Sequence, residues 1–186
     1  MRRVLIGFTA LMGFATANAA TYQIDPTHTY PNFTIDHLGY SMTYGRFGAT
    51  SGTIDLDLAK KTGAVNIVID AASIDTGFKK RDDHLRSPDF FNVNEFPQIT
   101  YKSTSVKFTS DSTAKVDGQL TIMGVTKPVS LDVTRIKCAV HPMNKKDVCG
   151  FDAKTAIKRS DFGVKYALPA VGDEVQIMIQ AEGVKQ

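Results

Sequence analysis

A histidine next to two carboxylates is the feature of this sequence that comes nearest to catalytic chemistry. His84 follows Asp82 and Asp83, and a histidine paired with a carboxylate can act as a general base. Residues one or two positions apart on a helix do not face each other, so this spacing argues against a working pair. The sequence also lacks the GxSxG, P-loop, GxGxxG and HExxH motifs. We therefore expect no catalytic residues and no enzyme.

The four histidines do not have the spacing of a metal site. They are scattered along the chain as His28, His37, His84 and His141. A structural or catalytic metal site needs three or four ligands at defined spacings, which these positions do not supply. We expect no metal and no cofactor.

The segment from Asp75 to Pro97, DTGFKKRDDHLRSPDFFNVNEFP, concentrates aromatic residues. It contains four of the 11 phenylalanines of the chain, namely Phe78, Phe90, Phe91 and Phe96. The segment is too short and too polar to form a core alone, so its aromatic side chains must cover or enter an apolar space formed elsewhere. We predict that it is a lid.

The lid segment carries two helix signals. A first turn is predicted over residues 79–85, where lysine and arginine at 79–81 would pair with Asp82 and Asp83 on the outer face. A second begins at Ser87-Pro88, because a serine N-cap followed by proline starts a helical turn. Leu85, Phe90 and Phe91 would then form the apolar inner face.

The rest of the chain shows the alternation of half-buried strands. Apolar residues of one parity occupy 33–37, 54–58, 65–69, 116–122, 129–133, 151–157 and 175–181, with shorter rows at 99–101 and 106–108. Turn residues separate them at 59–63, 109–112 and 123–128. An antiparallel up-and-down β-barrel of about eight strands fits this order, and a β-sandwich is the alternative. His37 shares the parity of Phe33 and Ile35 and would be a polar group inside the barrel.

The N-terminus has the pattern of a cleaved signal peptide. Residues 1–19 combine Arg2-Arg3, an apolar run and the small-x-small sequence Ala17-Asn18-Ala19. We predict cleavage there and one domain over residues 20–186, with no membrane span. The leader carries two of the 22 basic residues and none of the 19 acidic ones, which leaves a mature net charge of +1. A nearly neutral chain without a basic stripe does not indicate a nucleic-acid partner.

Two cysteines occur in this exported chain. Cys138 and Cys149 lack the CxxC spacing of a redox dithiol and flank the turn-like segment AVHPMNKKDV. In an oxidising compartment such a pair is expected to form a disulfide. Closing so short a loop contributes about 3 kcal/mol to stability.

Three motifs make the chain resemble the YceI-like family. They are FTIDHLGYSMTYGRFG at 33–48, SIDTGFKKRDDHLRSPDFFNVNEFPQITYKS at 73–103 and GQLTIMGVTKPV at 118–129, and KRSDFG at 158–163 also fits. The resemblance covers residues 22–181. It implies an extended lipocalin-like barrel in which an apolar cavity holds a polyisoprenoid, quinone-like or other long amphiphile, in the bacterial periplasm.

The resemblance also implies a set of ligand-binding residues. They lie in the first two motifs and are Phe33, Ile35, His37, Phe47, Phe78, His84, Leu85, Phe90, Phe91, Phe96 and Tyr101. The cysteine pair marks a subgroup of the family.

Three functions fit the sequence. The leading hypothesis is a periplasmic carrier that sequesters a long-chain isoprenoid. The second is an enzyme acting on such an amphiphile, with His84 or His37 as acid or base. The third is a cell-envelope interaction module with a packed interior and a partner-binding face over residues 79–83. Exposed strand edges and apolar lid faces also suggest a homodimer.

Overall fold

The computed structural model describes residues 19–186, which form one 11-stranded antiparallel sheet with three short helical elements. The strands are β1 Ala20–Ile24, β2 Tyr30–His37, β3 Ser41–Phe47, β4 Thr50–Asp57, β5 Thr62–Asp70, β6 Ile74–Asp75, β7 Gln98–Phe108, β8 Ala114–Ile122, β9 Val125–Val140, β10 Asp147–Lys158 and β11 Val171–Lys185. The helical elements are η1 Ala71–Ser73, α1 Lys79–Leu85 and η2 Arg159–Phe162. The leader predicted over 1–19 lies, except for Ala19, outside the described residues. Among the residues that are described, no helix is long and apolar enough to cross a membrane.

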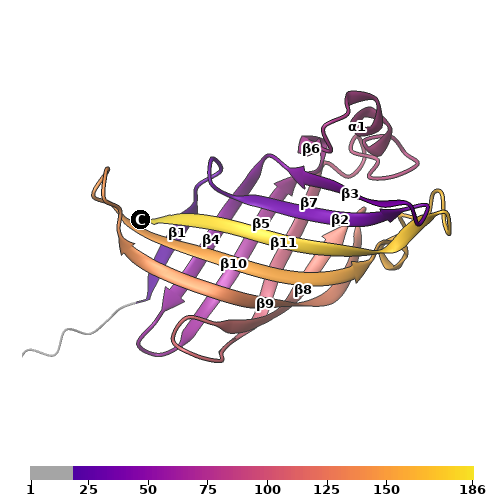
Figure 1. Ribbon diagram of the computed structural model, residues 1–186. Coiled ribbons are helices and arrows are strands. Elements are labelled where there is room, and N and C mark those ends of the chain that lie inside the picture. Colours follow the sequence, from indigo (N-terminus) through magenta and orange to yellow (C-terminus); the bar gives the residue numbers. More distant parts are fainter. Residues whose placement is uncertain (1–18) are drawn as a thin grey trace, which may run out of the picture.

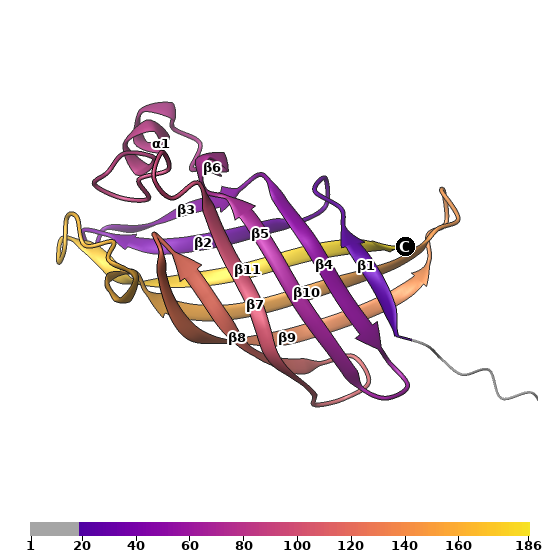
Figure 2. The same ribbon diagram turned by 180° about the vertical axis from the view of Figure 1, so that it is seen from behind.

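Pairing between the first and last strands closes the sheet into a barrel. One edge of β11 pairs with β10, and its other edge pairs first with β2 and then, from Gly183 to Lys185, with β1. The strands β1-β4-β5-β7-β8-β9-β10-β11 therefore form a closed ring, and β2, β3 and β6 extend the wall at one end (Figure 1). Figure 2 shows β4, β5 and β7 crossing the far side of the same barrel. The predicted barrel of about eight strands is confirmed, and closure excludes the sandwich.

The alternating rows predicted from the sequence face the barrel interior. The row at 65–69 on β5 and the row at 116–122 on β8 both contribute side chains to the inner wall. One member was placed wrongly. Leu58 lies in the turn after β4 and is exposed, because the strand ends at Asp57, whose carboxylate accepts a hydrogen bond from the Lys60 amide (2.9 Å).

The strands differ from the sequence prediction in three ways. The separate rows at 99–101 and 106–108 belong to the single strand β7, because a bulge between Ser103 and Ser105 changes the parity of the inward face. Strand β9 begins at Val125, since Met123-Gly124 alone makes the turn with positive φ at both residues. Strands β1, β3 and β6 were not predicted at all.

The lid segment folds as predicted at its first turn. Helix α1 spans the predicted residues 79–85, and it lies above one end of the barrel beside β6 (Figure 1). The chain then turns at Ser87-Pro88, where the amides of Phe90 and Asn92 donate to the Ser87 carbonyl at 3.0 and 2.9 Å. This second feature is a turn and not a further helix.

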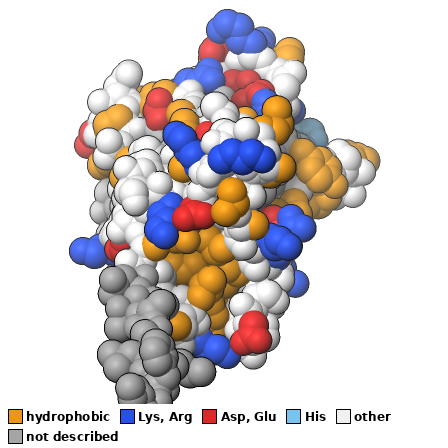
Figure 3. All heavy atoms as spheres, turned by 90° about the vertical axis from the view of Figure 1, so that its left-hand side faces the viewer, with side chains coloured by type: hydrophobic (Ala, Val, Ile, Leu, Met, Phe, Trp, Pro, Cys, Tyr) orange, Lys and Arg blue, Asp and Glu red, His pale blue; other side chains and the backbone are white. Residues whose placement is uncertain are grey.

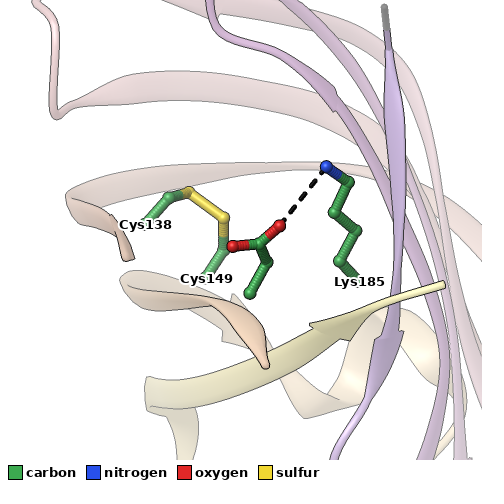
Figure 4. The surroundings of a disulfide bond; sticks show 4 residues. Cys138, Cys149 and Lys185 are labelled. Atoms are coloured by element: carbon green, nitrogen blue, oxygen red, sulfur yellow. Dashed lines mark hydrogen bonds and ion pairs between the residues drawn. A yellow bond between two sulfur atoms is a disulfide. The ribbon is translucent and has the colours of Figure 1, made fainter. Parts of the chain in front are cut away.

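The predicted disulfide joins two directly opposed residues of β9 and β10. Cys138 pairs with Cys149 across the hairpin, and Cys149 is fully buried. Tyr22 and Leu56 pack around it in a small apolar cluster. Beside it, Lys185 Nζ lies 3.4 Å from Asp147 Oδ2, which ties the end of β11 to the start of β10 (Figure 4). The disulfide thus stabilises the end of the barrel farther from α1.

Candidate ligand-binding cavity

An elongated cavity of about 470 Å³ runs through the barrel. On β11 its wall extends from Val171 to Ala181, which corresponds to about 33 Å of strand. Most wall side chains are aliphatic or aromatic, and the volume lies in the range of pockets that bind small molecules. This shape and composition can accommodate a long apolar guest.

The structure places nine of the eleven predicted ligand-binding residues in the cavity wall. They are Phe33, Ile35, His37, Phe47, His84, Leu85, Phe90, Phe91 and Tyr101. The other two lie elsewhere. Phe78 is exposed beneath the guanidinium of Arg81, 6.0 Å from its ring centre, and Phe96 packs against Gly124.

Three phenylalanines connect the barrel wall to the lid. The ring centres of Phe33 and Phe47 are 6.0 Å apart, and Phe91 meets Phe47 edge to face at 5.6 Å. Gly45 lies opposite Phe33 in the β2–β3 pair, and a side chain there would collide with the Phe33 ring. The absence of a side chain at Gly45 therefore gives the Phe33 ring its place in the wall.

The lid is anchored by buried polar contacts. Asp82 is buried and accepts hydrogen bonds from the amide (2.9 Å) and hydroxyl (2.5 Å) of Thr76. Arg86 donates from Nε to the Ala72 carbonyl and from Nη2 to the Ile74 carbonyl, both at 2.7 Å. These bonds satisfy backbone groups where the chain leaves the sheet, so α1 is held in one position.

This anchoring corrects the predicted pairing on the outer face of the lid. Asp83 does lie outside, with Lys79 at 2.6 Å and Arg86 at 3.2 Å. Asp82 was expected to pair with the neighbouring cations, but it points inward to Thr76. Lys79 and the Arg86 guanidinium hold the pKa of the Asp83 carboxyl below its ordinary value, with the Lys79 hydrogen bond the main cause.

His84 lies on helix α1 of the lid, at the rim of the cavity. Its Nε2 is 3.0 Å from Asp89 Oδ2, and its ring meets those of Phe90 at 5.0 Å and Tyr166 at 5.2 Å. Neither adjacent carboxylate contacts it, as the spacing argument predicted. Over residues 19–186 no hydroxyl or thiol hydrogen-bonds to this ring, so the pair with Asp89 has no attached nucleophile.

A buried arginine fixes the loop on the other side of the rim. Arg159 donates four hydrogen bonds of 2.8 to 3.0 Å to backbone carbonyls of the loop between η2 and β11 and of the start of β11. Asp173 accepts from the amide and hydroxyl of Ser160 at 2.9 and 2.7 Å. Phe162 is buried in the main core. The KRSDFG motif therefore builds the loop that carries Tyr166 and Ala167 into the cavity wall.

His37 lies at the open end of the barrel. It is the last residue of β2, its side chain lines the cavity, and the residue is exposed. His37 was predicted to lie inside the barrel, but it lies at the rim, because β2 ends at this residue. An exposed imidazole is hydrated by solvent and needs no buried partner.

The cavity wall continues toward the end farther from α1. Phe108 and Ile136 line it there and are only partly buried. Figure 3 views this end and shows apolar side chains in the centre of the face, with charged side chains around them. The apolar lining therefore extends from the lid to the opposite end of the barrel.

Residues 22–183 match the YceI-like domain. The chain belongs to the YceI-like family. Protein YceI of Shigella flexneri is 43% identical over 193 residues, with both chains covered completely. Among solved structures similar to this YceI-like chain, Burkholderia cenocepacia BcnA has a TM-score of 0.75 at 29% identity, over 86% of this chain and 98% of the other.

A third comparison bears on the fold alone. A polyisoprenoid binding domain from Saccharophagus degradans has a TM-score of 0.67 at 18% identity and covers 89% of this chain and 98% of its own. The resemblance predicted from the sequence motifs is thus confirmed at the level of family and fold.

Much of the cavity wall of this YceI-like protein was not predicted as ligand-binding. It comes from the C-terminal strands and includes Leu131, Val133, Phe151, Ile157, Ile177 and Ile179. Their alternation identified the strands, and the inward parity of each strand was the available signal for the wall. The motifs that predicted ligand-binding residues lie in the first half of the chain, whereas β9, β10 and β11 supply much of the cavity wall.

Proposed function

We propose that this protein is a carrier that sequesters a long-chain isoprenoid, or a similar amphiphile, in its barrel cavity. The observation that carries the proposal is the continuous apolar wall from the lid to the opposite end. The name of the Saccharophagus degradans relative, a polyisoprenoid binding domain, supports the same ligand class.

Apolar burial is enough to hold such a guest. Each CH₂ group taken out of water is worth roughly 0.8 kcal/mol, so a long chain gains affinity along its whole length without many hydrogen bonds. A distributed apolar wall of this kind selects for length and hydrophobicity more than for a particular functional group.

The polar head of the guest should lie at the lid end. The basic side chains in the wall at that end are His37, Arg81, His84 and Arg159. Arg159 is committed to backbone carbonyls, and Arg81 donates to the Thr76 hydroxyl and carbonyl at 2.7 Å. The two imidazoles and the hydrated rim are therefore the polar surroundings that a head group would meet.

The role we propose is not enzymatic. Among residues 19–186, the His84–Asp89 pair is the histidine–carboxylate pair whose imidazole lines the cavity, and that imidazole stacks against two aromatic rings at the rim. This packing supports a part in closing the cavity. An amphiphile incubated with the protein should be recovered chemically unchanged by mass spectrometry, and a new product that vanishes in His84→Ala would establish the enzyme instead.

The compartment we propose is the periplasm. The predicted leader over residues 1–19 supports export, and the disulfide between Cys138 and Cys149 suits an oxidising compartment. Intact mass of the protein from a periplasmic extract should match a chain that begins at Ala20 with one disulfide. A mature chain that keeps Met1 would refute this.

The carrier function is tested by native purification, organic extraction and mass spectrometry. We expect a prenyl or acyl lipid to accompany the protein in a fixed ratio. Repeated recovery of empty protein that also fails to take up added prenyl lipids would overturn the proposal and favour a packed interaction module.

A further inference from the structure

Large apolar side chains are exposed mainly around the lid end of the barrel. Of the ten such side chains exposed within residues 19–186, six lie there: Leu38, Tyr40, Met42, Tyr44, Phe78 and Tyr166. We call these six residues the rim surface. We propose that the rim surface docks on a phospholipid bilayer, so that the guest passes between membrane and cavity without crossing water. This inference rests on the proposed carrier function.

The rim surface is one continuous region although it comes from three segments. The amide of Leu38 donates to the Ala170 carbonyl at 3.1 Å, which joins the β2–β3 turn to the loop before β11. Tyr166 in that loop meets His84 of α1 at 5.2 Å. Phe78 immediately precedes α1. Figure 1 shows the β2–β3 turn and the loop before β11 side by side at one end, with α1 above them.

The rim surface surrounds the cavity opening. His37, His84 and Tyr166 line the cavity and are themselves exposed, so they mark the place where its wall meets solvent. A long apolar guest has a very low concentration in water, and its reservoir is a bilayer. An apolar surface around the opening would let the guest leave that reservoir with little of its chain exposed.

The residue types suit the boundary between lipid and water. Three of the six are tyrosines, whose rings are apolar and whose hydroxyls stay hydrated, as in the aromatic belts of membrane proteins. Tyr40 is 88% exposed and Tyr44 is 67% exposed. Large exposed apolar patches on proteins typically mark interaction surfaces.

Two lysines near the rim surface are placed to meet phospholipid phosphates. Lys80 on α1 and Lys165 beside Tyr166 have no acidic partner within 4.0 Å among residues 19–186. Two acidic groups of the lid are already paired, Asp83 with Lys79 and Asp89 with His84. Lysines close to an anionic membrane each add to its attraction.

A second copy of the chain is the competing occupant. Strand β3 pairs with β2 on one edge, but on the other edge only Arg46 and Phe47 pair with β6. The free edge at Ser41–Gly45 could pair with another β3. A copy bound there would cover Tyr44 and obstruct the opening through which the guest must pass, so we favour the bilayer.

The test compares vesicle binding by two matched double variants. Tyr40→Ser/Tyr44→Ser removes the two most exposed rim tyrosines, and Val140→Ser/Met143→Ser removes exposed apolar side chains at the opposite end. Vesicles of phosphatidylethanolamine and phosphatidylglycerol are mixed with each protein and sedimented. We expect the tyrosine variant to partition about ten-fold less onto vesicles and to release its lipid to them more slowly. The control should match the wild type.

The outcomes separate this inference from the carrier function. Wild-type protein that purifies with lipid but ignores the vesicles overturns the docking and leaves the carrier intact. Empty wild-type protein that binds vesicles through the same tyrosines supports the docking and overturns the carrier. Equal loss of vesicle binding in both variants would refute specific docking and indicate non-specific adhesion. A wild-type protein that does not bind vesicles and forms a dimer in light scattering, which Tyr44→Ser dissociates, would show that the rim surface binds a second copy of the chain.

Discussion

Gly118 and Tyr101 are a matched pair in the barrel wall. The ring of Tyr101 of β7 covers Gly118 of β8. Its hydroxyl is 3.0 Å from the Val116 carbonyl and 3.1 Å from that of Val129. Burial, with a smaller contribution from Asp117, raises the pKa of Tyr101 well above its ordinary value. The hydroxyl therefore stays neutral and donates to one of these carbonyls, a buried contact that depends on the missing side chain at Gly118.

We predict that Gly118→Ala destabilises the protein by about 1–3 kcal/mol. An added Cβ would lie 2.5 Å from Tyr101 Cζ and 2.7 Å from the Lys102 carbonyl oxygen, so both the ring and the backbone would have to move. Urea unfolding measures the loss. Gly150→Ala in β10 is the control, since its Cβ would find no atom nearer than 3.9 Å. Equal stability of the two variants would contradict the close packing at Gly118.

Asp25 and His28 should give the stability a pH dependence. His28 Nδ1 lies 2.9 Å from Asp25 Oδ2 and 4.0 Å from Glu182 Oε2. Hydrogen bonds from Thr27 and His28 lower the pKa of Asp25 to about 2, and the bond to Asp25 raises the pKa of His28. The raised His28 pKa contributes stability that is complete below its unfolded pKa of about 6.5 and is lost as the pH rises through the folded pKa.

We predict that Asp25→Asn costs more stability near pH 5.5 than near pH 9. The Asp25 carboxylate is ionised at both pH values, because its folded pKa is about 2. Its own contribution to stability is lost only as the pH falls from about 4 toward that folded pKa. Protonated His28 gains from that carboxylate only at the lower pH. Urea unfolding of wild type and variant at the two pH values measures the difference, and an identical loss at both would show that His28 does not respond to Asp25.

At the scale of elements, changes in the lid should affect ligand retention more than they affect folding. Phe90 and Phe91 face the cavity from the turn after α1, while Asp82 and Arg86 hold the helix through separate polar contacts. Replacing Phe90 and Phe91 by Ser should therefore weaken lipid retention more than export or disulfide formation. The measurement is the ratio of extracted lipid to protein, together with free-thiol content.

Phe96→Ser is the matched control for the lid prediction. Phe96 belongs to the same aromatic segment but packs against Gly124 and does not line the cavity. Its replacement should leave the lipid ratio near that of the wild type. An unaltered ratio of lipid to protein in the Phe90/Phe91 variant would mean that these two phenylalanines only pack in the core and do not retain the lipid.

The elements differ in how far the sequence could predict them. Helix α1 was predictable because its charge pattern is a local signal, whereas Ser87-Pro88, predicted to start a second helix, makes only a turn. Strand β3 was not, since Phe47 is the one apolar residue among its inward positions, which also include Thr43 and Gly45, and one apolar residue makes no alternating row. The strand exists because β2 pairs with it and the Phe33 ring fills the space above Gly45.

At the scale of the whole molecule, the cavity should behave as one continuous tube. Ala153 in the middle of β10 lines it, and Ala156 on the same strand is exposed and faces outward. Ala153→Phe should place a ring across the tube and reduce bound lipid sharply, whereas Ala156→Phe should not. Lipid extraction measures both. Full lipid loading of Ala153→Phe, with stability unchanged, would argue that the guest occupies only part of the tube.

The sequence by itself determined most of the strands, the lid helix, the cysteine pair and the family, because each depends on residue types at short spacing or on a linear motif. Tertiary structure alone decided which strands meet. The register of β11 against β1 and β2 closes the barrel, and that closure makes separate apolar rows into one wall. It also decided that Asp82 turns inward while Tyr40 and Tyr44 face solvent. Burial is a property of the assembled surface, and no local pattern specifies which neighbours will cover a side chain.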